Sequence, residues 1–147
     1  MDHPEQLALV REDPSLIPAA IDEILRVEAP VRGLFRRATV PSELGGAKIP
    51  AGARLFMLYA SGNRDESEFE RSEEFDIRRK DGNSHLAFAK GIHYCVGNAL
   101  ARLEGKLSFE MLLKRLPDIR RDPAEETVRR PYLVLRGFER LPVQWTV

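Results

Sequence analysis

Apolar residues recur at helical spacing in two stretches of this chain. The spacing predicts one helix over residues 16–27 and a longer one over residues 98–116, which stops before Pro117. A brief helix is also expected over residues 4–11, because its proline falls in the first turn, where backbone N–H groups lack intrahelical partners. Helices are therefore predicted to provide most of the framework.

Between the helices, the pattern changes to short strand-like segments. Residues 34–40 and 55–59 are predicted to be strands, with turns at Gly45-Gly46 and at Pro50-Ala51-Gly52. The polar, acidic stretch over residues 63–74 shows no packing period and is predicted to be an irregular meander. The strands are few and short, which predicts small sheets.

The end of the chain returns to this short-strand pattern. Residues 132–135 and 141–147 are apolar and flank Gly137-Phe138, which predicts a closing hairpin-like pair. The charged stretch over residues 117–130 is interpreted as a linker. Together these patterns predict a single α+β domain over residues 1–147, mainly α with small β-sheets.

The composition is that of an ordinary soluble globular protein, with 43% hydrophobic and 31% charged residues. Because 23 basic residues balance 23 acidic ones, no global field is expected to attract nucleic acid or an anionic membrane. A single cysteine excludes an internal disulfide, and a reducing compartment is the default expectation. With no leader segment and no apolar run of membrane-spanning length, the sequence predicts a cytoplasmic protein.

The single cysteine, Cys95, lies between Gly91 and Gly97, directly before the long predicted helix. At a helix N-terminus, unpaired N–H groups and the macrodipole favour an anion, so the thiol is expected to ionise readily. A thiolate is a nucleophile or a metal ligand. A nucleophile needs a base, and the side chain of His93, two residues away in a loop, is expected to point elsewhere. A buried, inert thiol is the remaining interpretation.

The pattern Phe88-x-x-Gly91-x-His93-x-Cys95-x-Gly97 resembles the haem-binding signature of the cytochrome P-450 family. The resemblance implies that Cys95 is the axial thiolate ligand of the iron in haem b. It also implies that Phe88 shields the sulfur and that His93 donates a hydrogen bond to a haem propionate. Gly91 and Gly97 would let the backbone approach the porphyrin.

The segment from Glu23 to Arg26 resembles the Glu-x-x-Arg helix motif of the same family. From periodicity alone, the two charged residues lie opposite the apolar face, which predicts a solvated pair worth a few tenths of a kcal/mol. The resemblance implies instead that they are buried and paired under the cysteine loop, together with a further arginine. Because Glu74 occupies the usual position of that arginine, Arg78 and Arg79 are the candidates, and Arg79 is assigned here.

Three further residues are interpreted with the help of the resemblance. Arg36 is assigned to a haem propionate, the alternative being a solvated charge on a strand edge. Ala89 stands where the family most often has glycine, and because alanine favours negative φ, the loop is expected to be slightly altered there. His85 is interpreted as a structural histidine rather than a ligand.

The resemblance covers nearly the whole chain, in the order of the C-terminal part of the family's fold. It implies a haem-thiolate monooxygenase that inserts one oxygen atom from dioxygen into a small apolar organic substrate. Electrons would come from a separate ferredoxin-type or flavoprotein donor. A basic patch of Lys90, Arg102 and Lys106 would dock this donor, although three solvated charges are an equal alternative.

The family's helix with an acid-alcohol pair for oxygen activation has no match in this sequence. An alternative function is therefore a truncated, non-catalytic haem-binding or remnant fragment, with poor stability and an exposed apolar patch. A cysteine-nucleophile enzyme is the third interpretation, and it lacks a placed base.

Overall fold

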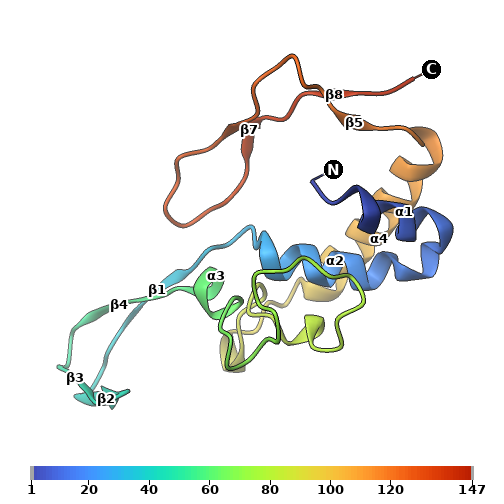
Figure 1. Ribbon diagram of the computed structural model, residues 1–147. Helices are drawn as coiled ribbons and strands as arrows, with labels where there is room; N and C mark the ends of the chain where they lie inside the picture. The colour runs from blue at the N-terminus through green and yellow to red at the C-terminus, as the bar shows by residue number, and fades with distance from the viewer. Residues whose placement is uncertain (1, 147) are drawn as a thin grey trace.

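The structure, a computed structural model, describes residues 2–146 and combines helices with short antiparallel sheets (Figure 1). The helices are α1 (Pro4–Glu12), α2 (Ile17–Val27), α3 (Tyr59–Gly62) and α4 (Asn98–Arg115), and 3-10 turns lie at η1 (Pro14–Leu16), η2 (Gly82–Ser84) and η3 (Gly91–His93). The strands are β1 (Leu34–Arg37), β2 (Ser42–Leu44), β3 (Ala47–Ile49), β4 (Arg54–Met57), β5 (Arg120–Arg121), β6 (Val128–Arg129), β7 (Phe138–Arg140) and β8 (Val143–Gln144). The predicted α+β class is confirmed.

Helix α2 lies at the centre of the helical part. Its apolar side packs on α1 and on the segment around Ile77, where Val10, Ile17 and Ile21 belong to one buried cluster. Helix α2 also contacts α4, and at Gly105 an added Cβ would lie 3.3 Å from Cδ1 of Ile21. A Cβ at Gly105 would require the Ile21 side chain to move by a few tenths of an ångström, so the two helices pack closely at this crossing.

A long hairpin projects from the helical part (Figure 1). Its inner strands, β1 and β4, pair antiparallel with Leu34 opposite Met57, and β2 and β3 pair across the predicted Gly45-Gly46 turn. Both inner strands are shorter than predicted. Strand β1 ends at Arg37, and β4 ends at Met57 because the chain turns into α3 at Tyr59, whose side chain is buried.

The prediction of a closing pair between residues 132–135 and 141–147 is wrong. Strand β6 pairs instead with β7, and β5 pairs with β8, so the predicted linker over residues 117–130 contributes two strands. Residues 132–135 form the connection between β6 and β7, where Leu135 makes an isolated bridge to Val31. The charged strands show no apolar alternation, because backbone pairing rather than burial defines them. Val147 lies outside the described residues.

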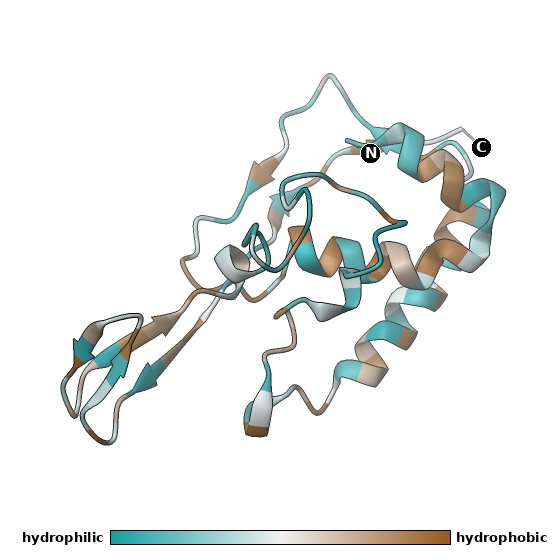
Figure 2. Cartoon of the chain, turned by 60° about the horizontal axis from the view of Figure 1, so that its bottom comes forward, coloured by the Kyte–Doolittle hydropathy of each residue, from teal (hydrophilic) through white to brown (hydrophobic). Residues whose placement is uncertain are grey.

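Helix α4 exposes much of its apolar surface. The helix itself is confirmed over nearly the predicted range, yet no side chain between Asn98 and Arg115 is buried. Figure 2 shows brown hydrophobic stretches along it, and the residues that leave about half of their surface exposed are Leu100, Leu103, Leu107 and Met111. The helix therefore carries an apolar face that the described residues do not cover.

Candidate cofactor site and buried ion network

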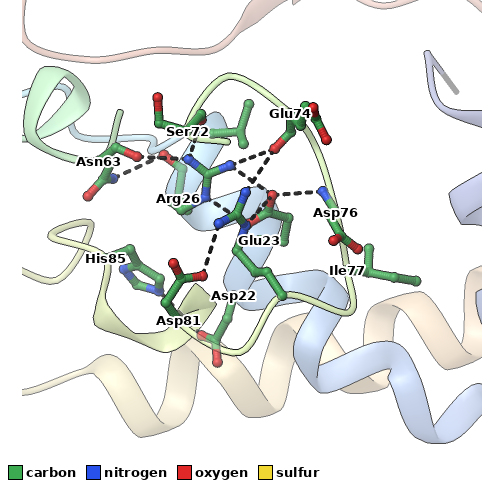
Figure 3. A network of polar contacts seen from close by, with 12 residues as sticks. Asp22, Glu23, Arg26, Asn63, Ser72, Glu74, Asp76, Ile77, Asp81 and His85 are labelled. Carbon is green, nitrogen blue, oxygen red and sulfur yellow. Dashed lines mark hydrogen bonds and ion pairs between the residues drawn. The ribbon is translucent and has the colours of Figure 1, made fainter. Parts of the chain in front are cut away.

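Glu23 and Arg26 are fully buried, so the solvated pair inferred from periodicity is wrong. Arg26 donates from Nε and Nη2 to the two carboxylate oxygens of Glu23, both at 2.8 Å, in a bidentate arrangement (Figure 3). Arg79 adds a second cation, with its Nε 3.0 Å from Oε2 of Glu23 and a side chain that is 4% exposed. Arg78 is exposed. The structure thus brings together Glu23, Arg26 and Arg79.

The predicted meander supplies the remaining partners of Arg26. Its Nη1 donates to the carbonyls of Asn63 at 2.8 Å and Ser72 at 2.6 Å, and Nη2 donates to the carbonyl of Glu74 at 2.8 Å. The side chain of Asn63 donates back to the Arg26 carbonyl at 3.0 Å and accepts from the Leu86 N–H at 2.6 Å. A buried ion pair is tolerable only when such bonds satisfy it.

Arg79 extends the network towards the surface. Its Nη1 lies 2.9 Å from Oδ1 of Asp81. Partial burial is the largest single influence and raises the pKa of Asp81, but the hydrogen bond and charge of Arg79 together with backbone hydrogen bonds outweigh it and hold this pKa below its ordinary value. Asp81 therefore remains a charged partner of Arg79 near neutral pH.

The cysteine loop is closed by backbone hydrogen bonds. The N–H of Cys95 donates to the carbonyl of Phe88 at 2.9 Å, and the Cys95 carbonyl accepts from Nδ2 of Asn98 at 2.8 Å. Because Gly97 is the N-cap of α4, Cys95 lies just before the first turn rather than within it. Its side chain is half-buried, which contradicts the interpretation of a buried, inert thiol.

Ala89 takes an unexpected backbone conformation in this loop. Its φ is +59°, in the left-handed region, although alanine was expected to keep a negative φ. The side chain is buried, and its N–H donates to the carbonyl of Leu86 at 2.8 Å. Ala89 thus keeps a glycine-type backbone, and the surrounding contacts offset the strain of about 1–2 kcal/mol.

The surface around Cys95 is open and apolar. Gly91 has a φ of +73°, and a Cβ built there would meet nothing within 4 Å. A Cβ at Gly97 would meet only the sulfur of Cys95, at 3.9 Å. Ile92 and Val96 are 97% and 102% exposed. A broad, flat, apolar group could therefore approach the sulfur without displacing a side chain.

Arg36 and His93 line one hollow of about 700 Å³, between the β1–β4 hairpin and the cysteine loop. Its other described lining residues are Phe35, Arg37, Gly52 and Arg54, and none of them is acidic. This positively charged hollow could hold carboxylates at the edge of a flat ring. A hollow of about 730 Å³ lies between α1, α2 and the C-terminal strands, and of its described lining residues none belongs to the candidate site.

The predicted basic patch is partly neutralised. Nε of Arg102 lies 3.0 Å from a carboxylate oxygen of Asp22, and Lys106 lies 3.8 Å from Glu110 on the next turn of α4. Within residues 2–146, no group of three or more His, Cys, Asp or Glu is placed to hold a metal ion by itself. None of the described helices is both long and apolar enough to cross a membrane.

Comparison with known proteins adds the following. Residues 11–126 match the family model described as Cytochrome P450. The chain is 44% identical over 146 residues to cytochrome P450 107B1 of Saccharopolyspora erythraea. This alignment covers 98% of this chain and 36% of that relative. It is also 44% identical over 144 residues to a steroid C26-monooxygenase of Mycobacterium tuberculosis, covering 97% of this chain and 38% of the relative.

A solved structure gives the same result for the fold. CYP109E1 from Bacillus megaterium, in complex with testosterone, matches with a TM-score of 0.96 at 33% sequence identity. The match covers 100% of this chain and 41% of that one. The chain therefore spans little more than a third of the length of the relatives that it matches.

Proposed function

The chain belongs to the cytochrome P450 family, and on this premise we propose that it provides the thiolate side of a haem-dependent monooxygenase. Cys95 would bind the iron of haem b through its thiolate. The observation that carries the proposal is the half-buried sulfur beside bare glycine backbone and exposed apolar side chains. A porphyrin needs such an open, apolar surface against one of its faces.

The residues around Cys95 fit this cofactor. Phe88, whose carbonyl accepts from the Cys95 N–H, shields the sulfur, and Gly91 and Gly97 leave room for the ring. Arg36 and His93 hold the propionates, because both line the hollow that carries positive charge. When bound, the haem supplies dioxygen activation and insertion of one oxygen atom into an organic substrate, and the protein orients it.

Substrate, partner and location follow from family membership and composition. A small apolar organic substrate is proposed, which the names of the steroid C26-monooxygenase and of the testosterone complex support by analogy. A ferredoxin-type or flavoprotein donor supplies the electrons. The single cysteine favours the reducing cytoplasm, and we treat residues 1–147 as one partial domain of the family.

A second candidate function is haem binding without monooxygenase activity by this chain alone. It is favoured by the open apolar surface at Cys95 and along α4, since activated oxygen needs a site closed to water. Supplying haem, a surrogate reductase and a panel of apolar substrates separates the two candidates. Product that matches the reducing equivalents consumed supports the monooxygenase, whereas peroxide without product supports the haem-binding chain.

The test of the proposal as a whole is a carbon monoxide spectrum of the reduced chain after reconstitution with haem. A thiolate-type spectrum is expected for the parent chain, and Cys95→Ala should abolish it. The matched control is Lys106→Gln, a change at an exposed position on α4 that should preserve the spectrum. If the parent chain shows no thiolate-type spectrum, or if Cys95→Ala keeps it, the proposed ligand is wrong.

A further inference from the structure

Asp22, His85 and Arg102 form a second polar cluster, separate from the network around Glu23. Asp22 lies on α2, and its Oδ1 is 3.3 Å from Nε2 of His85; Figure 3 labels both residues. The same oxygen accepts from Nε of Arg102 at 3.0 Å. The His85 side chain is 1% exposed, whereas Asp22 and Arg102 are 20% and 31% exposed. The cluster therefore ties α2, the approach to the cysteine loop and α4 to one carboxylate.

The hydrogen bonds fix the orientation of the His85 ring. Its Nδ1 accepts from the Ala87 N–H at 3.2 Å, so the ring proton is assigned to Nε2, which donates to Asp22. Burial lowers the pKa of His85 below its ordinary value, and this outweighs the opposite effect of Asp22. The imidazole is thus a neutral, oriented donor.

Two members of the cluster, His85 and Arg102, lie beside the ring of Phe88. The centroid of that ring lies 5.7 Å from the His85 centroid, and the guanidinium carbon of Arg102 lies 4.7 Å from it. The second distance is within the range of a cation–π contact. Phe88 is buried, and its carbonyl accepts the N–H of Cys95 at 2.9 Å. A fixed Phe88 therefore fixes one side of the Cys95 backbone.

Arg102 also reaches the other side of Cys95. Its Nη1 lies 3.4 Å from Oδ1 of Asn98, and Nδ2 of the same asparagine donates to the Cys95 carbonyl at 2.8 Å. The Cys95 N–H is thus hydrogen-bonded to Phe88 and the Cys95 carbonyl to Asn98, and Arg102 contacts both of these residues.

We propose that Asp22, His85 and Arg102 act as one unit that positions Cys95 for its ligand role. Arg102 contacts Phe88 and Asn98, Asp22 orients Arg102, and His85 completes the packing of the Phe88 ring. The inference rests on the proposed function, because it presumes that Cys95 binds the haem iron. The residues are positioning residues, since none of them touches the sulfur.

The test uses the carbon monoxide spectrum of the reduced, haem-reconstituted full chain. The measured quantity is the ratio of the form with a thiolate-type spectrum to the form with a thiol-type spectrum. Arg102→Gln and Asp22→Asn should each lower the ratio of the two forms several-fold, and the double variant should lose no more than the worse single variant, because the residues act together. The matched control is Lys106→Gln, one turn along α4, which should leave the ratio unchanged. If the loss in the double variant equals the product of the losses in the two single variants, the residues act independently and the joint role is wrong.

A second readout does not depend on haem. In the apo chain, the rate at which a thiol reagent labels Cys95 should change several-fold in Arg102→Gln and stay constant in Lys106→Gln, with a circular dichroism spectrum confirming that both variants are folded. Unchanged labelling and unchanged spectra in both Arg102→Gln and Asp22→Asn would overturn the proposal. Failure of the proposed function is distinguishable, because the parent chain itself would then lack a thiolate-type spectrum.

Discussion

The ion network around Glu23 and the surface around Cys95 are built in opposite ways. In the network, charged side chains are shielded from water, and carbonyl groups of the meander satisfy Arg26. Around Cys95, apolar side chains such as Ile92 and Val96 face water. Buried charges and exposed apolar patches are the two informative departures from ordinary packing. The network is complete within the chain, and we infer that a bound group completes the open surface.

The largest expected effect is the loss of stability when the ion network around Glu23 is broken. Arg26→Ala leaves the carboxylate of Glu23 buried with one cation fewer, and removing one partner of a buried pair costs about 3–5 kcal/mol. That loss is a large part of the whole stability of a small domain, so the variant should unfold at a much lower urea concentration than the parent chain.

Urea unfolding measures this loss, with Arg78→Ala as the matched control. Arg78 is exposed, and its replacement should change the free energy of unfolding by no more than about 0.5 kcal/mol. Equal unfolding midpoints for Arg26→Ala and Arg78→Ala would show that the network does not stabilise the fold.

The next effect contrasts a core residue with the open face of α4. Ile21→Ala removes a buried side chain that packs against Gly105 and should cost about 2–5 kcal/mol. Leu103→Ala changes a side chain that is 51% exposed, so it should cost less than Ile21→Ala by at least about 1 kcal/mol. Urea unfolding compares the two.

The same face should govern self-association. Leu103→Glu places a charge in the exposed apolar face of α4, so light scattering of the apo chain should fall relative to the parent chain. Unchanged scattering would mean that this face is not the source of association.

A smaller effect concerns the positively charged hollow. Arg36→Gln removes a charge-assisted hydrogen bond to a propionate and should weaken haem binding by about 1.5–3 kcal/mol, as measured by haem titration. Lys48→Gln on β3 removes a charge from the same hairpin but outside the hollow. This variant should bind haem with the affinity of the parent chain. Equal losses in both variants would point to general electrostatics rather than a propionate site.

The smallest effect is a pH dependence of folding. Because burial lowers the pKa of His85 below its ordinary value of 6.5, the unfolded chain binds a proton at this residue more readily. Stability should therefore fall as pH drops from neutrality through the folded-state pKa of His85. His85→Gln should flatten this slope in urea unfolding between about pH 7 and 5. A parallel slope in both proteins would exclude His85 as the source.

The sequence is informative about the framework and about the cysteine loop. Periodicity predicted α2 and α4, and the Phe88 to Gly97 pattern located the loop before α4. Periodicity failed at Glu23 and Arg26 because backbone groups in and just after the meander complete their hydrogen bonding. Arg26 donates to carbonyl groups of residues 63–74, and Glu23 accepts from the Asp76 N–H, and such backbone groups leave no mark in the residue types. Only the family resemblance placed this pair in the interior.

Other features were hidden for related reasons. Strands β5 and β6 consist of charged or mixed residues whose partners lie later in the chain, so no local alternation marks them. Asp22 and Arg102 are separated by 80 residues, and their contact depends on how α2 and α4 cross. The left-handed backbone at Ala89 is set by the loop as a whole and opposes the preference of the residue itself.

The central claim is that the sulfur of Cys95 binds the haem iron, and iron-edge X-ray absorption of the haem-reconstituted chain tests it most directly. We predict one sulfur neighbour of the iron in the parent chain and in Lys106→Gln. In Cys95→Ala that neighbour should be missing, with only light-atom ligands remaining. A sulfur neighbour that persists in Cys95→Ala, or one that is absent from the folded, haem-loaded parent chain, would contradict the account.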